Sequence, residues 1–154
     1  MDFFDLIRQG DSNGIEQAIQ KDPDVLQSTD SRGFSPLVLA SYNEQYEITE
    51  LLLKSGAEVN ARDAAGNTAL MGVCFKGNTA IAELLLKNGA DVNIQNSNGS
   101  TALIYSATFG QQKIAELLLQ YGADKSLEDV QGNTAYHYAK LQENPVLEEM
   151  VKEL

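Results

Sequence analysis

Apolar residues recur along the chain with the spacing of an amphipathic helix. Ile48, Leu51 and Leu52 stand at positions i, i+3 and i+4, which lie on one face of a helix. The same stripe returns 33 residues later and then once more, at Ile81, Leu84 and Leu85 and at Ile114, Leu117 and Leu118. Each stripe is followed by a glycine suited to the left-handed end of a helix, namely Gly56, Gly89 and Gly122. The pattern therefore predicts a series of equivalent helices.

A shorter helix is predicted ahead of each stripe. A hydroxyl residue suited to N-capping precedes a proline or an alanine at the first helical position. The caps are Ser35, Thr68, Thr101 and Thr134, and the expected helices are Pro36–Asn43, Ala69–Lys76, Ala102–Phe109 and Ala135–Leu141. Polar, turn-rich stretches such as Asn60–Gly66 and Asn93–Gly99 link one unit to the next.

The regular period predicts one stacked domain. A two-helix unit of this size cannot bury its own apolar face, so neighbouring units must pack against each other. We expect internal units at residues 31–63, 64–96 and 97–129, with capping units at 1–30 and 130–154. The first cap is expected to hold helices at Asp2–Gln9 and about Asn13–Gln20, and Asn144 with Pro145 is expected to start the last helix.

Two recurring motifs resemble the ankyrin repeat. The resemblance lies in two segments that are characteristic of that family. They match residues 63–70 (Asp-Ala-Ala-Gly-Asn-Thr-Ala-Leu) and 84–93 (Leu-Leu-Leu-Lys-Asn-Gly-Ala-Asp-Val-Asn). The resemblance is strong from Asp30 to Leu154 and weak before it. It implies an all-α solenoid of about five helix-turn-helix units with turn-rich loops. It also implies protein–protein binding through a concave side formed by loop tips and first helices.

The charge balance narrows the partners. The formal net charge is −11, from 22 acidic and 11 basic residues, and no cluster of Lys and Arg exists to follow a phosphate backbone or an anionic membrane. A protein partner with a basic contact patch suits this charge. Acids near the N-terminus and short apolar runs argue against a signal peptide and a membrane span, so we expect a cytoplasmic protein.

Candidates for catalysis or metal binding are sparse. His137 is the only histidine and Cys74 the only cysteine. A lone histidine is weak evidence for catalysis, and the resemblance gives it a structural role, with bonds to neighbouring backbone and cap groups. Cys74 is expected to be buried and unreactive, and the two residues together fall short of a zinc site. We therefore predict no enzymatic activity, no cofactor and no metal.

The repeat frame predicts which residues contact a partner. They are the loop-tip and first-helix positions that the fold does not require for itself. The set is Arg32, Phe34, Tyr42, Asn43, Ala65, Asn67, Phe75, Lys76, Asn98, Ser100, Thr108, Phe109, Gln131 and Asn133. Its four aromatic members are either interface anchors or residues tucked against the next unit. Residues 67–99 carry no net charge between acidic neighbours, so we expect Phe75 to be the central anchor.

Two functions follow from the sequence. The leading one is a non-enzymatic module, an adaptor or scaffold, that binds a partner protein as a monomer. The alternative is a dedicated inhibitor or immunity-type protein that occludes one basic enzyme or toxin. The third hypothesis is an enzyme of an unexpected kind, and the fourth is self-association of the chain through its groove.

Overall fold

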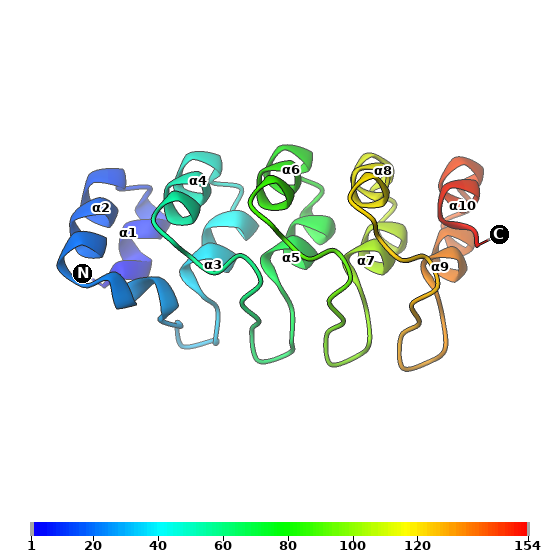
Figure 1. The fold of residues 1–154 in the computed structure, drawn as a ribbon, viewed down its shortest axis with the longest axis horizontal. Coiled ribbons are helices and arrows are strands. Elements are labelled where there is room, and N and C mark those ends of the chain that lie inside the picture. Colours follow the sequence, from blue (N-terminus) through cyan, green and yellow to red (C-terminus); the bar gives the residue numbers. More distant parts are fainter. Residues whose placement is uncertain (1, 154) are drawn as a thin grey trace.

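The computed structural model describes residues 2–153, and within that range the chain is entirely helical, without a strand. Figure 1 shows helix pairs following one another from the N-terminus to the C-terminus along the long axis, with hairpin-like loops projecting to one side. The helices are α1 (Phe3–Gln9), α2 (Ser12–Lys21), a 3₁₀ helix η1 (Pro23–Gln27), α3 (Pro36–Tyr42), α4 (Tyr46–Lys54), α5 (Ala69–Lys76), α6 (Thr79–Lys87), α7 (Ala102–Thr108), α8 (Gln112–Gln120), α9 (Ala135–Leu141) and α10 (Pro145–Val151). The predicted all-α solenoid is confirmed.

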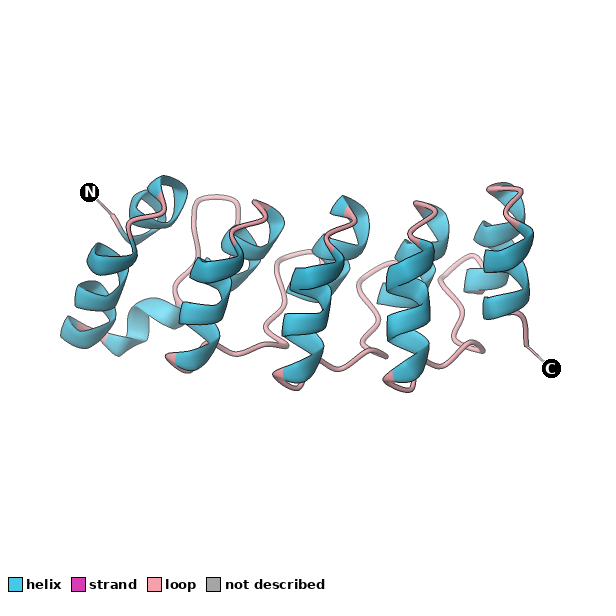
Figure 2. Ribbon diagram, turned by 90° about the horizontal axis from the view of Figure 1, so that it is seen from above, coloured by secondary structure: helices cyan, strands magenta, loops and turns pink. Residues whose placement is uncertain are grey.

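The helices form two rows. The odd-numbered helices contact one another along the stack, as α3 does α5 and α5 does α7, and they make the inner row. The even-numbered helices from α4 to α10 make the outer row, and Figure 2 shows both rows from above. The helices expected ahead of each stripe start as predicted and end within one residue of the prediction. The short η1, which joins α2 to the first loop, was not predicted.

The N-caps explain where the inner helices start. Ser35, Thr68 and Thr101 accept hydrogen bonds from the backbone N–H three residues ahead, as predicted. Thr134 stands at the predicted cap position of α9, but its side chain makes no capping bond. The backbone N–H of His137 instead donates to the carbonyl of Thr134 at 3.1 Å, so the backbone already satisfies the amide that the hydroxyl would cap.

The core is a continuous stripe along the stack. Leu52, Leu85, Leu118 and Val151 occupy one register of the outer helices, and all four are fully buried. Gly89 ends α6 with φ of 91°, and Ala90 N–H donates to the Leu85 carbonyl at 3.1 Å, which closes the helix as predicted. Cys74 is fully buried in α5, as expected, and burial raises the pKa of its thiol. None of the helices among residues 2–153 has the length and apolarity needed to cross a membrane.

Candidate functional site

The loop tips form a row that the chain itself holds in place. In each loop one acidic or amide side chain accepts two backbone N–H groups: Asp63 Oδ1 accepts those of Ala65 and Asn67, both at 2.9 Å. Adjacent tips are joined by backbone bonds, from Ser97 N–H to the Ala65 carbonyl at 3.0 Å and from Val130 N–H to the Asn98 carbonyl at 2.9 Å. The tips of the last three loops therefore stand at fixed positions beside the inner helices (Figure 1).

Three aromatic side chains form a strip across the inner helices. Tyr42 of α3, Phe75 of α5 and Phe109 after α7 keep 39%, 47% and 41% of their surface exposed. The Tyr42 and Phe75 rings stack with centroids 6.1 Å apart, and Phe75 meets Phe109 edge-on at 4.8 Å. We call Tyr42, Phe75 and Phe109 the aromatic strip. Their contact unites three of the four aromatic residues that the repeat frame predicts for the groove.

A hollow of about 450 Å³ lies between the aromatic strip and the loop tips. Residues of two loops and three inner helices line it, and they are Arg32, Phe34, Val38, Leu39, Tyr42, Asp63, Asn67, Thr68, Met71, Gly72, Phe75, Tyr105 and Phe109. Phe34, the fourth predicted aromatic, is half-buried in this lining and does not join the strip. The surface is therefore hollowed where the central unit meets its neighbours.

Two cations of the chain lie on aromatic faces beside the hollow. The Arg32 guanidinium stands 4.8 Å from the centre of the Phe34 ring, and Lys76 Nζ stands 5.0 Å from the centre of the Tyr42 ring. Both were predicted as contact residues, and both are exposed. The Phe34 and Tyr42 rings are thus each paired with a cation of the chain.

The other predicted contact residues divide into exposed and internally engaged ones. Asn43, Ala65, Asn98 and Gln131 are exposed, and Asn133 is half-buried. Asn67 Oδ1 accepts from Asn96 Nδ2 at 2.8 Å, and Thr108 Oγ1 donates to the Ile104 carbonyl at 2.8 Å. Ser100 is the least exposed of the set, with 9% of its surface exposed, and its N–H donates to Asn96 Oδ1.

Comparison with family models matches this architecture. A model for three copies of the ankyrin repeat covers residues 70–154, and a model for many copies covers residues 37–86. The chain belongs to the ankyrin repeat family. Ankyrin repeats are general protein–protein interaction modules and are typically non-enzymatic.

His137 departs from the role that the ankyrin resemblance implied. Its side chain is exposed and makes no hydrogen bond to any residue from 2 to 153, so the predicted structural bonding is wrong. The ring instead meets the ring of its sequence neighbour Tyr138 edge-on at 5.1 Å. Among the described residues, no three His, Cys, Asp or Glu side chains are grouped so that they could hold a metal ion.

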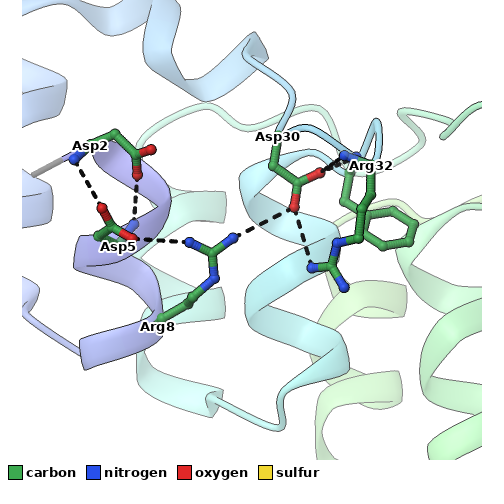
Figure 3. Close-up of polar contacts among 6 residues, drawn as sticks. Asp2, Asp5, Arg8, Asp30 and Arg32 are labelled. Carbon is green, nitrogen blue, oxygen red and sulfur yellow. Dashed lines mark hydrogen bonds and ion pairs between the residues drawn. The ribbon is translucent and has the colours of Figure 1, made fainter.

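We number the repeats by the inner helix that each loop precedes, so that Asp30 belongs with α3 to the second repeat, Asp63 with α5 to the third, Asn96 with α7 to the fourth and Asp129 with α9 to the last. The loop residues at this position have different partners. In the second repeat, Asp30 Oδ2 receives Arg32 at 3.3 Å and Arg8 at 3.8 Å, as Figure 3 shows. Arg8 also pairs with Asp5 of its own helix at 3.1 Å, so the contact between Arg8 and Asp30 ties α1 to the first loop. Burial would raise the pKa of Asp30, but hydrogen bonds from the Phe34 and Arg32 amides, together with the guanidinium, hold that pKa below its ordinary value.

The last repeat satisfies its loop acid in another way. The Tyr138 hydroxyl donates to Asp129 Oδ2, while the amides of Asn133 and Gln131 donate to Oδ1. Burial would raise the pKa of Asp129, but these donors leave it below its ordinary value, and the bond to the carboxylate raises the pKa of Tyr138. In the fourth repeat the acid is replaced by Asn96, whose Nδ2 donates to the Tyr105 hydroxyl at 2.8 Å.

The predicted contact set lacks seven residues that line the hollow, namely Val38, Leu39, Asp63, Thr68, Met71, Gly72 and Tyr105. A signal was present, because Gly72 stands 33 residues before Tyr105 and 66 before Tyr138. The third repeat therefore carries a glycine where the two following repeats carry a tyrosine that meets the loop. This substitution opens the hollow next to Asp63.

Proposed function

We propose that this chain is a binding module that holds a partner protein against the concave surface made by the loop tips and the inner helices. The aromatic strip is the observation that carries the proposal. Three large rings from three successive repeats touch one another and remain exposed, and exposed aromatic clusters are typical anchors of protein interfaces.

The charge distribution favours a partner with a basic contact patch. The chain carries a net charge of −11, while the segment 67–99 that contains Phe75 is neutral. An apolar, neutral centre inside an acidic surround has the composition of an interface core and rim. Complementary charge in the partner would speed its encounter with this surface.

A narrower function of the same surface is dedicated inhibition. The chain is small and acidic, and its hollow is large enough to admit a side chain from a basic enzyme or toxin. In that case the partner's own active site would be the surface that the strip covers. The identity of the bound partner separates an adaptor from an inhibitor.

The test is capture of a partner from a lysate of the native cell, followed by measurement of its affinity. We expect Phe75→Ala to weaken binding at least about tenfold, and a combined Phe34, Tyr42, Phe75 and Phe109→Ala variant to abolish capture. Tyr46→Ala and Tyr121→Ala are the matched controls, because these side chains are 38% and 42% exposed and belong to the outer row. Equal affinity in the strip variants, with circular dichroism unchanged, would place the binding surface elsewhere.

A further inference from the structure

The third repeat contains a carboxylate oxygen without a partner. Asp63 Oδ1 accepts two backbone amides, but its Oδ2 receives no hydrogen bond and no ion pair from any described residue. The equivalent oxygen is paired with arginine in the second repeat and with a tyrosine hydroxyl in the last. An unpaired carboxylate oxygen inside a lined hollow is a place where a ligand can donate.

The third repeat lacks both kinds of side chain that donate to the loop acid in the other repeats, the arginine and the tyrosine. Ala65 stands at the position that Arg32 holds one repeat earlier, and Gly72 stands at the position of Tyr105 and Tyr138. A Cβ at Gly72 would meet only Tyr42 Cδ1, at 3.5 Å, which is ordinary van der Waals contact. The fold therefore has room for a side chain at this position, and the glycine leaves the room open.

The opening has the chemistry of a cation pocket. Asp63 contributes the negative charge, and Tyr42, Phe75 and Tyr105 contribute aromatic surface. We name Asp63, Gly72, Tyr42, Phe75 and Tyr105 the Asp63 pocket. A cation that enters it gains an ion pair and contacts with ring faces at the same time, and partial shielding from water strengthens both.

We propose that the Asp63 pocket receives an arginine side chain of the partner protein, a refinement that rests on the protein-binding function proposed above. The second repeat provides the precedent within this chain. There Arg32 pairs with the equivalent acid, Asp30, and its guanidinium lies over the ring of Phe34. In the third repeat the acid and the aromatic surface are present and the arginine must come from outside.

Charge and shape favour arginine over other donors. A tyrosine of the partner would supply one hydroxyl but leave the charge of Asp63 unmatched in a chain of net charge −11. Lysine would match the charge, but its ammonium lacks the planar group that stacks on rings and donates in a fork. Arg32 also lines the hollow, and its pairing with Asp30 offsets its repulsion of an incoming guanidinium.

The direct test uses small probes without any partner. The amide spectrum of the ¹⁵N-labelled chain is recorded during titration with N-acetyl-arginine methylamide, and then with the corresponding lysine and citrulline compounds. Citrulline has nearly the shape of arginine but carries no charge. We expect saturating shifts at Asp63, Gly72 and Phe75 with the arginine probe, at a dissociation constant on the order of 1 mM for a ligand of this size. Lysine should bind more weakly, and citrulline should give no shift.

Two variants test the pocket separately: one fills its space and the other removes its charge. Gly72→Tyr places in the third repeat the residue that fills this position in the fourth and fifth. Asp63→Asn removes the charge and keeps the turn, since Asn96 accepts the same pair of amides in the next loop. We expect both variants to fold and to lose the arginine shifts. Asp91→Asn is the control, because it removes one turn acid that accepts a backbone amide and does not line the hollow.

Failure of this proposal is distinguishable from failure of the proposed function. Absent arginine shifts, equal shifts with citrulline, or shifts unchanged in Gly72→Tyr would each overturn the arginine pocket. If Phe75→Ala still abolished partner capture while Gly72→Tyr retained it, the binding surface would stand and the pocket would not. A Gly72→Tyr chain that loses both the arginine shifts and partner affinity, with Asp91→Asn unaffected, is the supporting result.

Discussion

The third and the last repeat follow one template and treat its polar groups differently. In the third, Thr68 caps α5, and Asp63, which lines the hollow, has no partner at Oδ2 among the described residues. In the last, Thr134 makes no side-chain cap, and Asp129 Oδ2 is closed by the Tyr138 hydroxyl. The difference lies in the surroundings as well, because α6 packs against both α4 and α8, whereas α10 packs in the outer row against α8 alone.

The two loops are tied to the stack alike. The third loop is bonded to one neighbouring loop, through Ser97 N–H and the Ala65 carbonyl, and it stays ordered with one carboxylate oxygen unpaired. The last loop is also bonded to one neighbouring loop, through Val130 N–H and the Asn98 carbonyl, and it adds an internal bond through Tyr138. The bonds between loops therefore do not account for the difference between Gly72 and Tyr138, which is why we assign Gly72 to binding.

The largest expected effect on the free energy of unfolding comes from truncating a core leucine, either in a middle repeat or in the last repeat. Leu85 and Leu147 are both fully buried, in α6 and α10. Leu85→Ala should lower the free energy of unfolding by about 2–5 kcal/mol, because neighbours on both sides keep the cavity from collapsing. Leu147→Ala should have a smaller effect on global unfolding in urea, and hydrogen exchange should show α9 and α10 opening first. Similar losses, with uniform exchange along the chain, would contradict the distinction.

An intermediate effect on the free energy of unfolding is expected from removing the Tyr138 hydroxyl, which bonds to Asp129 in the last loop. Tyr138→Phe leaves Asp129 Oδ2 unpaired, as Asp63 Oδ2 is, and should lower the free energy of unfolding by about 1–2 kcal/mol. Tyr136→Phe is the control in the same helix, since its hydroxyl has no partner among residues 2–153. Urea unfolding of both variants checks this, and equal stability of the two would show that the Tyr138 bond contributes nothing.

The sequence predicted whatever depends on the repeat period and on short-range signals. Helix starts followed from caps such as Ser35, helix ends from glycines such as Gly89, and the aromatic strip from the register of Tyr42 and Phe75. The side-chain bonds expected of Thr134 and His137 are absent, because each depends on which of several nearby groups takes one hydrogen bond. That competition is decided by three-dimensional distances of a few tenths of an ångström, and the repeat pattern carries no such information.

The Asp63 pocket shows a different limit of sequence reasoning. A repeat-by-repeat alignment contains Gly72 opposite Tyr105 and Tyr138. Its meaning depends on knowing that this helix position faces the loop acid, which the hydrogen bond between Tyr138 and Asp129 establishes. A residue that is missing from a repeated position becomes informative only when the structure shows what its equivalents touch.

The smallest expected effect is the pH dependence of the last repeat. Burial alone would raise the pKa of Asp129, but its hydrogen bonds, led by that of Tyr138, leave the folded pKa below the unfolded value of about 4. Stability from this group is therefore complete above about pH 4 and is lost as the pH falls through the folded pKa. The loss should stay below about 1 kcal/mol, because solvent screens the site.

Urea unfolding of wild type and Asp129→Asn between about pH 6 and pH 3 isolates this contribution, since other carboxyls such as Asp30 titrate in both chains. The stability advantage of wild type over Asp129→Asn should shrink toward the acid end. Tyr138→Phe should reduce the same slope without removing it, because the Asn133 and Gln131 amides still bind the carboxylate. A slope that Tyr138→Phe leaves unchanged would mean that the backbone amides alone hold the Asp129 charge, so that the last loop, like the third, is ordered without its side-chain donor.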